Sequence, residues 1–91
     1  MSTKERVLEE VLIEEAVSNL NKIILFNDDV NTFDHVIEML ITICDHEPLQ
    51  AEQCAILVHY TGKCEVKTGK LSELVPKCSA LLEAGLSAEI Q

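Results

Sequence analysis

Residues 22–29 read KIILFNDD, a run rich in apolar and β-branched residues that ends abruptly in an amide and two carboxylates. Such a run predicts a β-strand over residues 22–26, and the polar residues 27–29 predict the turn that stops it. Because the apolar run is continuous rather than alternating, we expect this strand to be central in a sheet and covered on at least one face.

Two amphipathic helices are predicted after this turn. Thr32 suits the N-cap of the first helix, whose apolar residues recur with helical spacing up to about Asp45. Pro48 suits the first position of the second helix, and Gly62 suits its C-terminal stop. The apolar positions are Phe33, Val36, Ile37, Leu40, Ile43 and Cys44 in the first helix and Leu49, Ala51, Cys54, Ala55 and Val58 in the second.

A second strand, a third helix and a last short strand complete the pattern. Residues 64–68 alternate in polarity as a strand does, and residues 71–82 carry the clearest helical stripe of apolar side chains. An interior proline costs about 3 kcal/mol, so Pro76 could instead separate a short first turn from the main helix. Gly85 stops this helix, and residues 86–90 can form a strand. The order β-α-α-β-α-β predicts a small α+β domain with its helices packed on a three-stranded antiparallel sheet.

Residues 1–20 differ from the rest of the chain, because glutamates are threaded through their apolar positions. The apolar residues recur at roughly helical spacing, but no clear cap is present and a short isolated helix is marginal in water. We therefore expect residues 1–20 to be a flexible N-terminal extension and residues 21–91 to be the folded domain. The extension is interpreted either as a solvated tail or as a segment that another protein complex binds.

Composition and charge narrow the class of protein. The chain has 91 residues, of which 47% are hydrophobic and 25% charged, as in a single globular domain. Sixteen acidic residues against seven basic ones give a net charge of −9, which is the wrong sign for binding nucleic acid and attracts cationic or amine-bearing partners. With no apolar run of about 18–20 residues and no signal-peptide core, we expect no membrane association and a cytoplasmic location.

Four cysteines, Cys44, Cys54, Cys64 and Cys78, occur without any C-x-x-C spacing. A disulfide framework belongs to small secreted chains, and structural zinc sites need closely spaced ligand pairs. We expect buried free thiols and neither a metal nor another cofactor, with metal binding and a disulfide as the weaker alternatives.

Two polar features carry the candidate chemistry. Residues 27–32 read NDDVNT, which is typical of an Asx-rich turn that caps the following helix, but three consecutive amide or carboxylate residues exceed what one cap needs. His59 lies near the end of the second predicted helix, and it is either a core or rim residue or a functional one. Composition alone leaves both alternatives open.

The segments Ile23–Asp29 and Ile56–Lys63, at their present separation, resemble ClpS, the adaptor of the ATP-dependent Clp protease. The resemblance extends from Ile23 to about Lys77. It implies a domain that binds the first residue of an N-degron, namely a free α-amine together with a bulky side chain such as Leu, Phe, Tyr or Trp. It also implies that the adaptor delivers the bound substrate to a Clp AAA+ unfoldase for degradation.

The resemblance also implies the binding residues. Asn27, Asp29 and His59 would accept hydrogen bonds from the α-amine, and Asp28 would hold the first peptide amide. The pocket wall would be formed by Asn31, Phe33, Ala55 and Val58. Phe33 and Ala55 stand where the family commonly has Met, and Asn31 stands where Thr is common, so the preference among bulky first residues stays open.

A docking face is implied on the third predicted helix. Lys77 matches a family lysine that contacts the N-domain of a ClpA-like or ClpC-like unfoldase, while Ser72 replaces a glutamate and Glu73 is adjacent to it. The alternative for Lys77 is an ordinary solvated charge.

Three rival interpretations compete with the adaptor. Asp29 and His59 could form an acid–base pair, but no nucleophile or phosphate-binding motif accompanies them, so we do not expect an enzyme. The C-terminal domain of the ribosomal stalk protein has a similar element order, which would predict an interaction module without interest in free N-termini. The third alternative is an adaptor-like domain whose altered pocket has lost the usual ligands.

Overall fold

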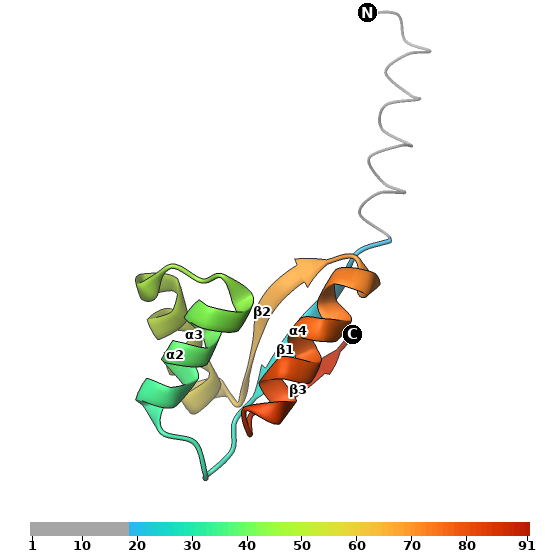
Figure 1. Ribbon diagram of the computed structural model, residues 1–91. Helices are drawn as coiled ribbons and strands as arrows, with labels where there is room; N and C mark the ends of the chain where they lie inside the picture. Colours follow the sequence, from blue (N-terminus) through green and yellow to red (C-terminus); the bar gives the residue numbers. More distant parts are fainter. Residues whose placement is uncertain (1–18) are drawn as a thin grey trace, which may run out of the picture.

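The computed structural model describes residues 19–91 (Figure 1). The elements, in chain order, are β1 (Asn21–Phe26), α2 (Phe33–Cys44), α3 (Pro48–Thr61), β2 (Lys63–Gly69), α4 (Leu71–Glu83) and β3 (Ser87–Ile90). The three strands form one antiparallel sheet in the order β2-β1-β3. The predicted α+β fold, with helices packed on a three-stranded antiparallel sheet, is confirmed.

The central position of β1 explains its continuous apolar sequence. Ile23, Ile24 and Leu25 are all buried, and β1 is paired on both sides. The register with β2 shifts between Ile23, which faces Lys67, and Ile24, which faces Glu65. Val66 is therefore an extra residue in β2, which makes a β-bulge at the middle of the strand.

The helix boundaries follow local signals in the sequence. The hydroxyl of Thr32 accepts a hydrogen bond from the backbone N–H of His35 at 3.2 Å, as expected of an N-cap. Pro48 begins α3, and its preceding residue Glu47 exchanges capping contacts with Gln50. Gly62 ends α3 with a φ of 94°, a conformation that L side chains disfavour.

α4 continues through Pro76 without interruption, so the alternative of a divided helix is wrong. The proline removes the backbone bond to the carbonyl of Ser72, one turn earlier. Its ring lies on the exposed side of the helix, while Leu74, Cys78 and Leu81 on the opposite side are buried. Burial of this apolar stripe offsets the lost hydrogen bond.

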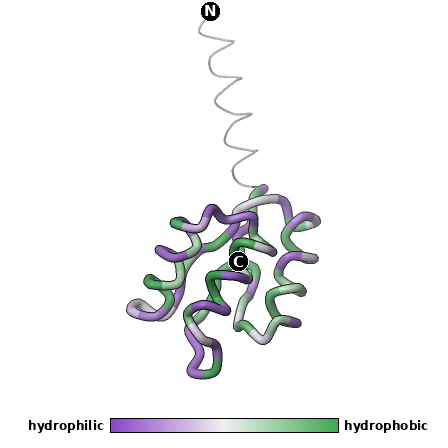
Figure 2. Tube along the Cα trace, turned by 60° about the vertical axis from the view of Figure 1, so that its left-hand side comes forward, coloured by the Kyte–Doolittle hydropathy of each residue, from purple (hydrophilic) through white to green (hydrophobic). Residues whose placement is uncertain are grey.

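The core lies between the sheet and the helices and is aliphatic. In Figure 1, α4 lies across the sheet, and α2 and α3 form a hairpin beside β2. Hydrophilic and hydrophobic residues alternate along the helical coils in Figure 2. All four cysteines are free, as expected, but only Cys44 and Cys78 are buried, whereas Cys54 and Cys64 are half-buried at the edge of the core.

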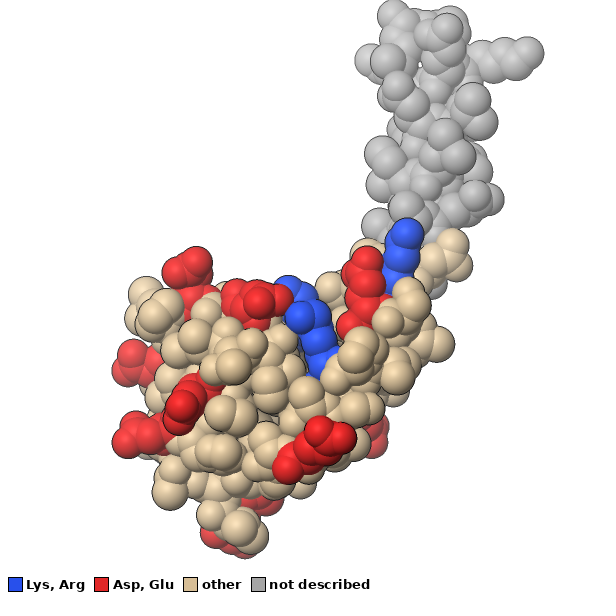
Figure 3. Space-filling view, in the orientation of Figure 1, with Lys and Arg blue, Asp and Glu red and all other residues tan. Residues whose placement is uncertain are grey.

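The charged side chains of residues 19–91 are mostly acidic. Acidic side chains are spread over the face shown in Figure 3, where basic ones are few. Within residues 19–91, no helix combines the length and apolar character needed to cross a membrane. Residues 1–18 lie outside the described part of the chain, so the extension predicted over residues 1–20, and the boundary at residue 21, stay predictions.

Candidate functional site: a pocket at the end of β1

A cavity of about 310 Å³ opens where β1 ends, between the start of α2 and the second half of α3. Every residue that was predicted to bind the ligand lines it: Asn27, Asp28, Asp29, Asn31, Phe33, Ala55, Val58 and His59. One backbone bond draws the two sequence segments together, because the N–H of Asn27 donates to the carbonyl of Gly62 at 2.9 Å. The end of β1 is thereby fixed beside the end of α3, which carries His59.

Asp28 builds the turn that follows β1. One of its carboxylate oxygens accepts the backbone N–H groups of Val30 and Asn31, at 3.0 and 2.9 Å, and the other accepts the side-chain amide of Asn31 at 2.8 Å. The bond from the Asn31 backbone N–H is the main reason why the pKa of the Asp28 carboxyl lies below its usual range. Asp28 is thus an ionised Asx-turn residue as well as a residue of the pocket lining.

Three other polar residues of the pocket, unlike Asp28, have side chains without hydrogen bonds in the described part of the chain. Within residues 19–91, the side chains of Asn27, Asp29 and His59 make no hydrogen bond to the protein. All three residues are exposed at the pocket. An amide oxygen, a carboxylate and an imidazole nitrogen are therefore available as acceptors at one rim.

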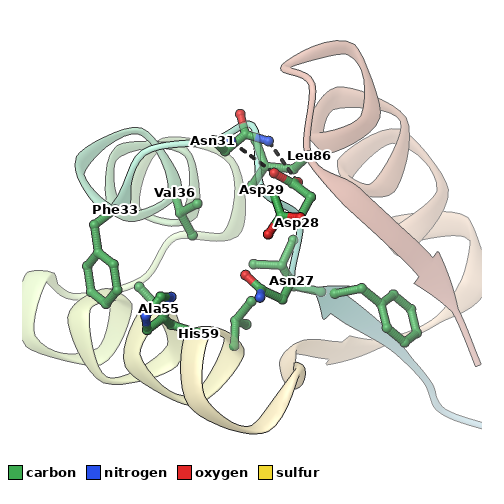
Figure 4. A pocket seen from close by; sticks show the side chains of 12 residues that line it. Asn27, Asp28, Asp29, Asn31, Phe33, Val36, Ala55, His59 and Leu86 are labelled. Carbon is green, nitrogen blue, oxygen red and sulfur yellow. Dashed lines mark hydrogen bonds between the residues drawn. The ribbon is translucent and has the colours of Figure 1, made fainter.

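Aromatic contacts orient His59. The ring of Phe33 lies edge-on to the imidazole with centroids 5.8 Å apart, and the ring of Tyr60 lies edge-on at 5.0 Å. Figure 4 shows Phe33, which leaves α2, on the same side of the pocket as Ala55 and His59 of α3. Phe33 is 40% exposed, so it forms part of the pocket's mouth rather than of the core.

The inner surface of the cavity is apolar. Leu25, Ala55, Val58 and Leu86 each expose 5% or less of their surface, and all four line the cavity. Sequence reasoning missed several lining residues, namely Leu25, Phe26, Val36 and Leu86. The first three belong to predicted elements beside the turn, whereas Leu86 reaches the site only through the packing of α4 and β3, which no local pattern reveals.

The lining favours binding over nucleophilic chemistry. Among the described residues, it contains no Ser, Thr, Cys or Lys side chain. In the same range, no group of three or more His, Cys, Asp or Glu residues could hold a metal ion. The arrangement of acceptors around an apolar hollow suits a ligand that carries a cation next to a hydrophobic group.

The two predicted docking residues lie on α4, away from this pocket. Ser72 is exposed, and so is the neighbouring Glu73. Lys77 is half-buried, because its ammonium group lies 3.1 Å from the carbonyl oxygen of Ile43 and 3.1 Å from a carboxylate oxygen of Asp45. Lys77 therefore joins α4 to the C-terminal end of α2 and is not a freely solvated charge.

Comparison with known proteins shows which family the chain resembles in sequence. Residues 17–89 match the family model described as ATP-dependent Clp protease adaptor protein ClpS. The ClpS adapter protein of Acetivibrio thermocellus is 32% identical over 98 aligned positions, which cover 100% of this chain and 98% of that protein. The ClpS adapter protein of Campylobacter jejuni is 34% identical over 71 positions, which cover 76% of this chain and 72% of that protein.

The structural comparison agrees with this fold. The structure of Agrobacterium tumefaciens ClpS2 bound to L-phenylalaninamide has a TM-score of 0.73 against this one, with 22% sequence identity, over 80% of this chain and 95% of that one. Together, the fold and the relatives define a small α+β adaptor domain. The chain belongs to the ClpS family, whose members are adaptors of the ATP-dependent Clp protease.

Proposed function

We propose that this chain binds the N-terminal residue of substrate proteins, and that it recognises a free α-amine together with a bulky hydrophobic side chain such as Leu, Phe, Tyr or Trp. The observation that carries the proposal is the position of Asn27, Asp29 and His59, whose unused acceptors stand at the rim of an apolar cavity. The ClpS2 protein of A. tumefaciens is bound to L-phenylalaninamide in its solved structure. That ligand combines an α-amine with an aromatic side chain, which supports the same ligand chemistry here.

The amine is recognised by the three free acceptors. A protonated α-amine has three N–H donors, and Asn27, Asp29 and His59 offer one acceptor group each. Charge-assisted hydrogen bonds of this kind contribute about 1.5–3 kcal/mol each. An acetylated amine is neutral and keeps a single N–H, so two of these acceptors would lose their partner.

The first peptide group is held by Asp28. The Oδ2 atom of Asp28 accepts one hydrogen bond, from the side-chain amide of Asn31. Its second lone pair is free for the amide N–H of the ligand. The Asx turn keeps this carboxylate ionised and in place before the ligand arrives. Preorganisation of this kind reduces the entropic cost of binding.

The side chain of the first residue enters the apolar part of the cavity. Burial of a Leu or Phe side chain contributes about 1.5–3 kcal/mol. A charged first side chain would lose its hydration without finding a partner among Ala55, Val58 and Leu86. Allowing for the cost of association, we expect dissociation constants on the order of micromolar or tighter.

Delivery requires a second surface, which we place on α4 and in residues 1–18. Ser72 is free to meet the N-domain of a ClpA-like or ClpC-like unfoldase. Lys77 uses two of its three donors on Ile43 and Asp45, so one N–H is left for the partner. Residues 1–18 would be engaged by the unfoldase during transfer of the substrate.

Fluorescence anisotropy with short labelled peptides tests the proposal. The peptides differ only in the first residue, which is Leu, Phe, Trp, Tyr, Met, Ile, Arg or N-acetyl-Leu. We expect saturable binding of the bulky hydrophobic set, loss of binding on acetylation, and loss in Asp29→Asn, which removes charge at nearly constant size. Equal binding of the free and acetylated Leu peptides would contradict recognition of the amine.

A further inference from the structure

The turn that leaves α4 has a defined geometry. Gly85 has a φ of 89°, its N–H donates to the carbonyl of Leu82, and the N–H of Leu86 donates to the carbonyl of Leu81, both at 3.0 Å. This pair of bonds is a Schellman motif, which ends the helix and fixes the direction of the next residue. The next residue is Leu86, which is 3% exposed and lines the pocket.

Two side chains, one from the loop before α2 and one from the first turn of α2, hold this turn. The side-chain amide of Asn31 donates to the carbonyl of Gly85 at 2.8 Å. The Nε2 atom of His35, in the first turn of α2, lies 2.9 Å from the carbonyl oxygen of Ala84. Because a carbonyl oxygen only accepts, this nitrogen carries the proton. The carbonyl groups of Ala84 and Gly85, the two residues that follow α4, thereby gain partners around the start of α2.

The same two residues connect the turn to the rest of the site. Asn31 also donates its side-chain amide to Asp28, so one side chain links the turn that holds the ligand's backbone to the turn that carries Leu86. Figure 4 shows the side chain of Asn31 next to Asp28, with the hydrogen bonds between these two residues drawn as dashed lines. His35 adds a second connection, and its ring is half-buried.

We propose that Asn31 and His35 are positioning residues that hold Leu86 in the pocket wall and so set how large a first side chain the pocket accepts. The inference rests on the proposed function. His35 does not line the cavity, and both residues act on the wall through the carbonyl groups of Ala84 and Gly85. Loss of the His35 contact would let the wall retreat and favour larger first residues.

The test compares His35→Ala, His35→Gln and Glu38→Ala with the unchanged protein. Glu38 is exposed on the same helix, and its side chain is outside the pocket lining, so it serves as the control. Glutamine carries an amide N–H that can replace the donor of His35. Anisotropy is measured with peptides that begin with Leu, Trp or N-acetyl-Leu, and thermal melting is measured in parallel.

We expect His35→Ala to shift the ratio of Leu to Trp affinity toward Trp by about fivefold, while acetylation still abolishes binding. His35→Gln and Glu38→Ala should keep the ratio within about twofold of the original. A purely structural role would lower the melting temperature and weaken both peptides equally, and that result would overturn the inference. If His35→Ala does not fold, the same ratio is measured in Asn31→Ala, where a shift toward Trp is again expected and an unchanged ratio overturns the inference.

The two proposals fail in different ways. If the unchanged protein binds no peptide with a free amine, the proposed function fails and the inference falls with it. If the unchanged protein binds such peptides and the ratio stays constant across the His35 variants, only the positioning role is refuted.

Discussion

The Nε2 atom of His46 lies 2.6 Å from the carbonyl oxygen of Val66, the extra residue of the β2 bulge. His46 is 5% exposed, and this contact ties the connection between α2 and α3 to the middle of the sheet. Val66 has no register partner in β1, and His46 supplies a hydrogen-bond donor to its carbonyl. The β2 bulge and the buried side chain of His46 are therefore joined by one hydrogen bond.

Replacement of His46 should destabilise the domain. His46→Ala leaves the Val66 carbonyl without its donor, which costs about 1–3 kcal/mol, and the lost packing adds to this. His46→Gln keeps an N–H at a similar distance and should recover part of the loss. Urea unfolding of both variants measures the difference, and equal losses would show that packing alone, not the hydrogen bond, holds this site.

The ion pair between Lys77 and Asp45 predicts a specific dependence of stability on pH. A hydrogen bond from Lys77, followed by its charge, holds the pKa of the Asp45 carboxyl below its ordinary value of 3.8. A lowered pKa in the folded state stabilises the protein above the ordinary value, and the contribution disappears as pH falls through the lower folded value. Asp45→Asn should therefore lower the melting temperature at pH 7 and leave it nearly unchanged once the pH lies below the folded pKa. A constant difference across the pH series would contradict this origin.

The thiols of Cys44 and Cys64 should be unreactive in the folded protein. Burial is the main reason why the pKa of Cys44 is raised to about 11 and that of Cys64 to about 12. The thiolate is the reactive form, so alkylation by iodoacetamide at pH 8 should be much slower at these two positions than in urea-unfolded protein. Peptide mass spectrometry after timed labelling measures each site. Labelling of Cys44 as fast as in the unfolded chain would refute the prediction.

The same raised pKa values act on stability in alkali. Between the ordinary value of 9.0 and about 11 to 12, the unfolded chain loses thiol protons that the folded chain keeps. The unfolded state is favoured by that difference, so stability should fall as pH rises through this range. Cys44→Ala removes one such group, and its stability should decline less steeply over the same range.

Phe33→Ala should weaken discrimination among bulky first residues. The phenyl ring borders the mouth of the cavity and contacts the ring of His59, so its removal both widens the entrance and frees the imidazole. We expect a flatter affinity ranking across the first-residue peptides. Tyr60→Ala is the matched control, because Tyr60 also contacts His59 but does not line the cavity. An unchanged ranking in Phe33→Ala would refute the role of this side chain.

Deletion of residues 1–18 should separate binding from delivery. All residues that line the pocket lie between Leu25 and Leu86, so the shortened chain should bind peptides with unchanged affinity. Degradation of a reporter that begins with Leu, by a purified Clp unfoldase and its peptidase, should be lost. Weakened peptide binding by the shortened chain would contradict this division.

Much of the fold could be predicted because its signals are local. Thr32, Pro48 and Gly62 mark helix ends through the conformation of one or two residues, and the structure places them as expected. The turn at residues 27–29 likewise depends on neighbours along the chain. These features need no knowledge of tertiary packing.

The features that escaped prediction depend on distant contacts. Leu86 enters the pocket only because α4 packs across the sheet, and the packing of that helix also decides that Pro76 does not divide it. Lysine is ordinarily a solvated surface residue, yet the ammonium group of Lys77 contacts Ile43 and Asp45 at the C-terminal end of α2. No pattern along the chain encodes such proximities, since they arise when separate elements come together.

The central position of β1 has a mechanical consequence. Antiparallel hydrogen bonds run perpendicular to their strands, and β1 is bonded to β2 on one side and to β3 on the other. Lys22 also exchanges two backbone bonds with Gln91, of 3.0 and 2.8 Å. A pull on residues 1–18 along the strand would load all these bonds in shear at once instead of opening them one by one. We therefore expect the sheet to resist unfolding by a force applied through residues 1–18, because such a force must break these bonds together.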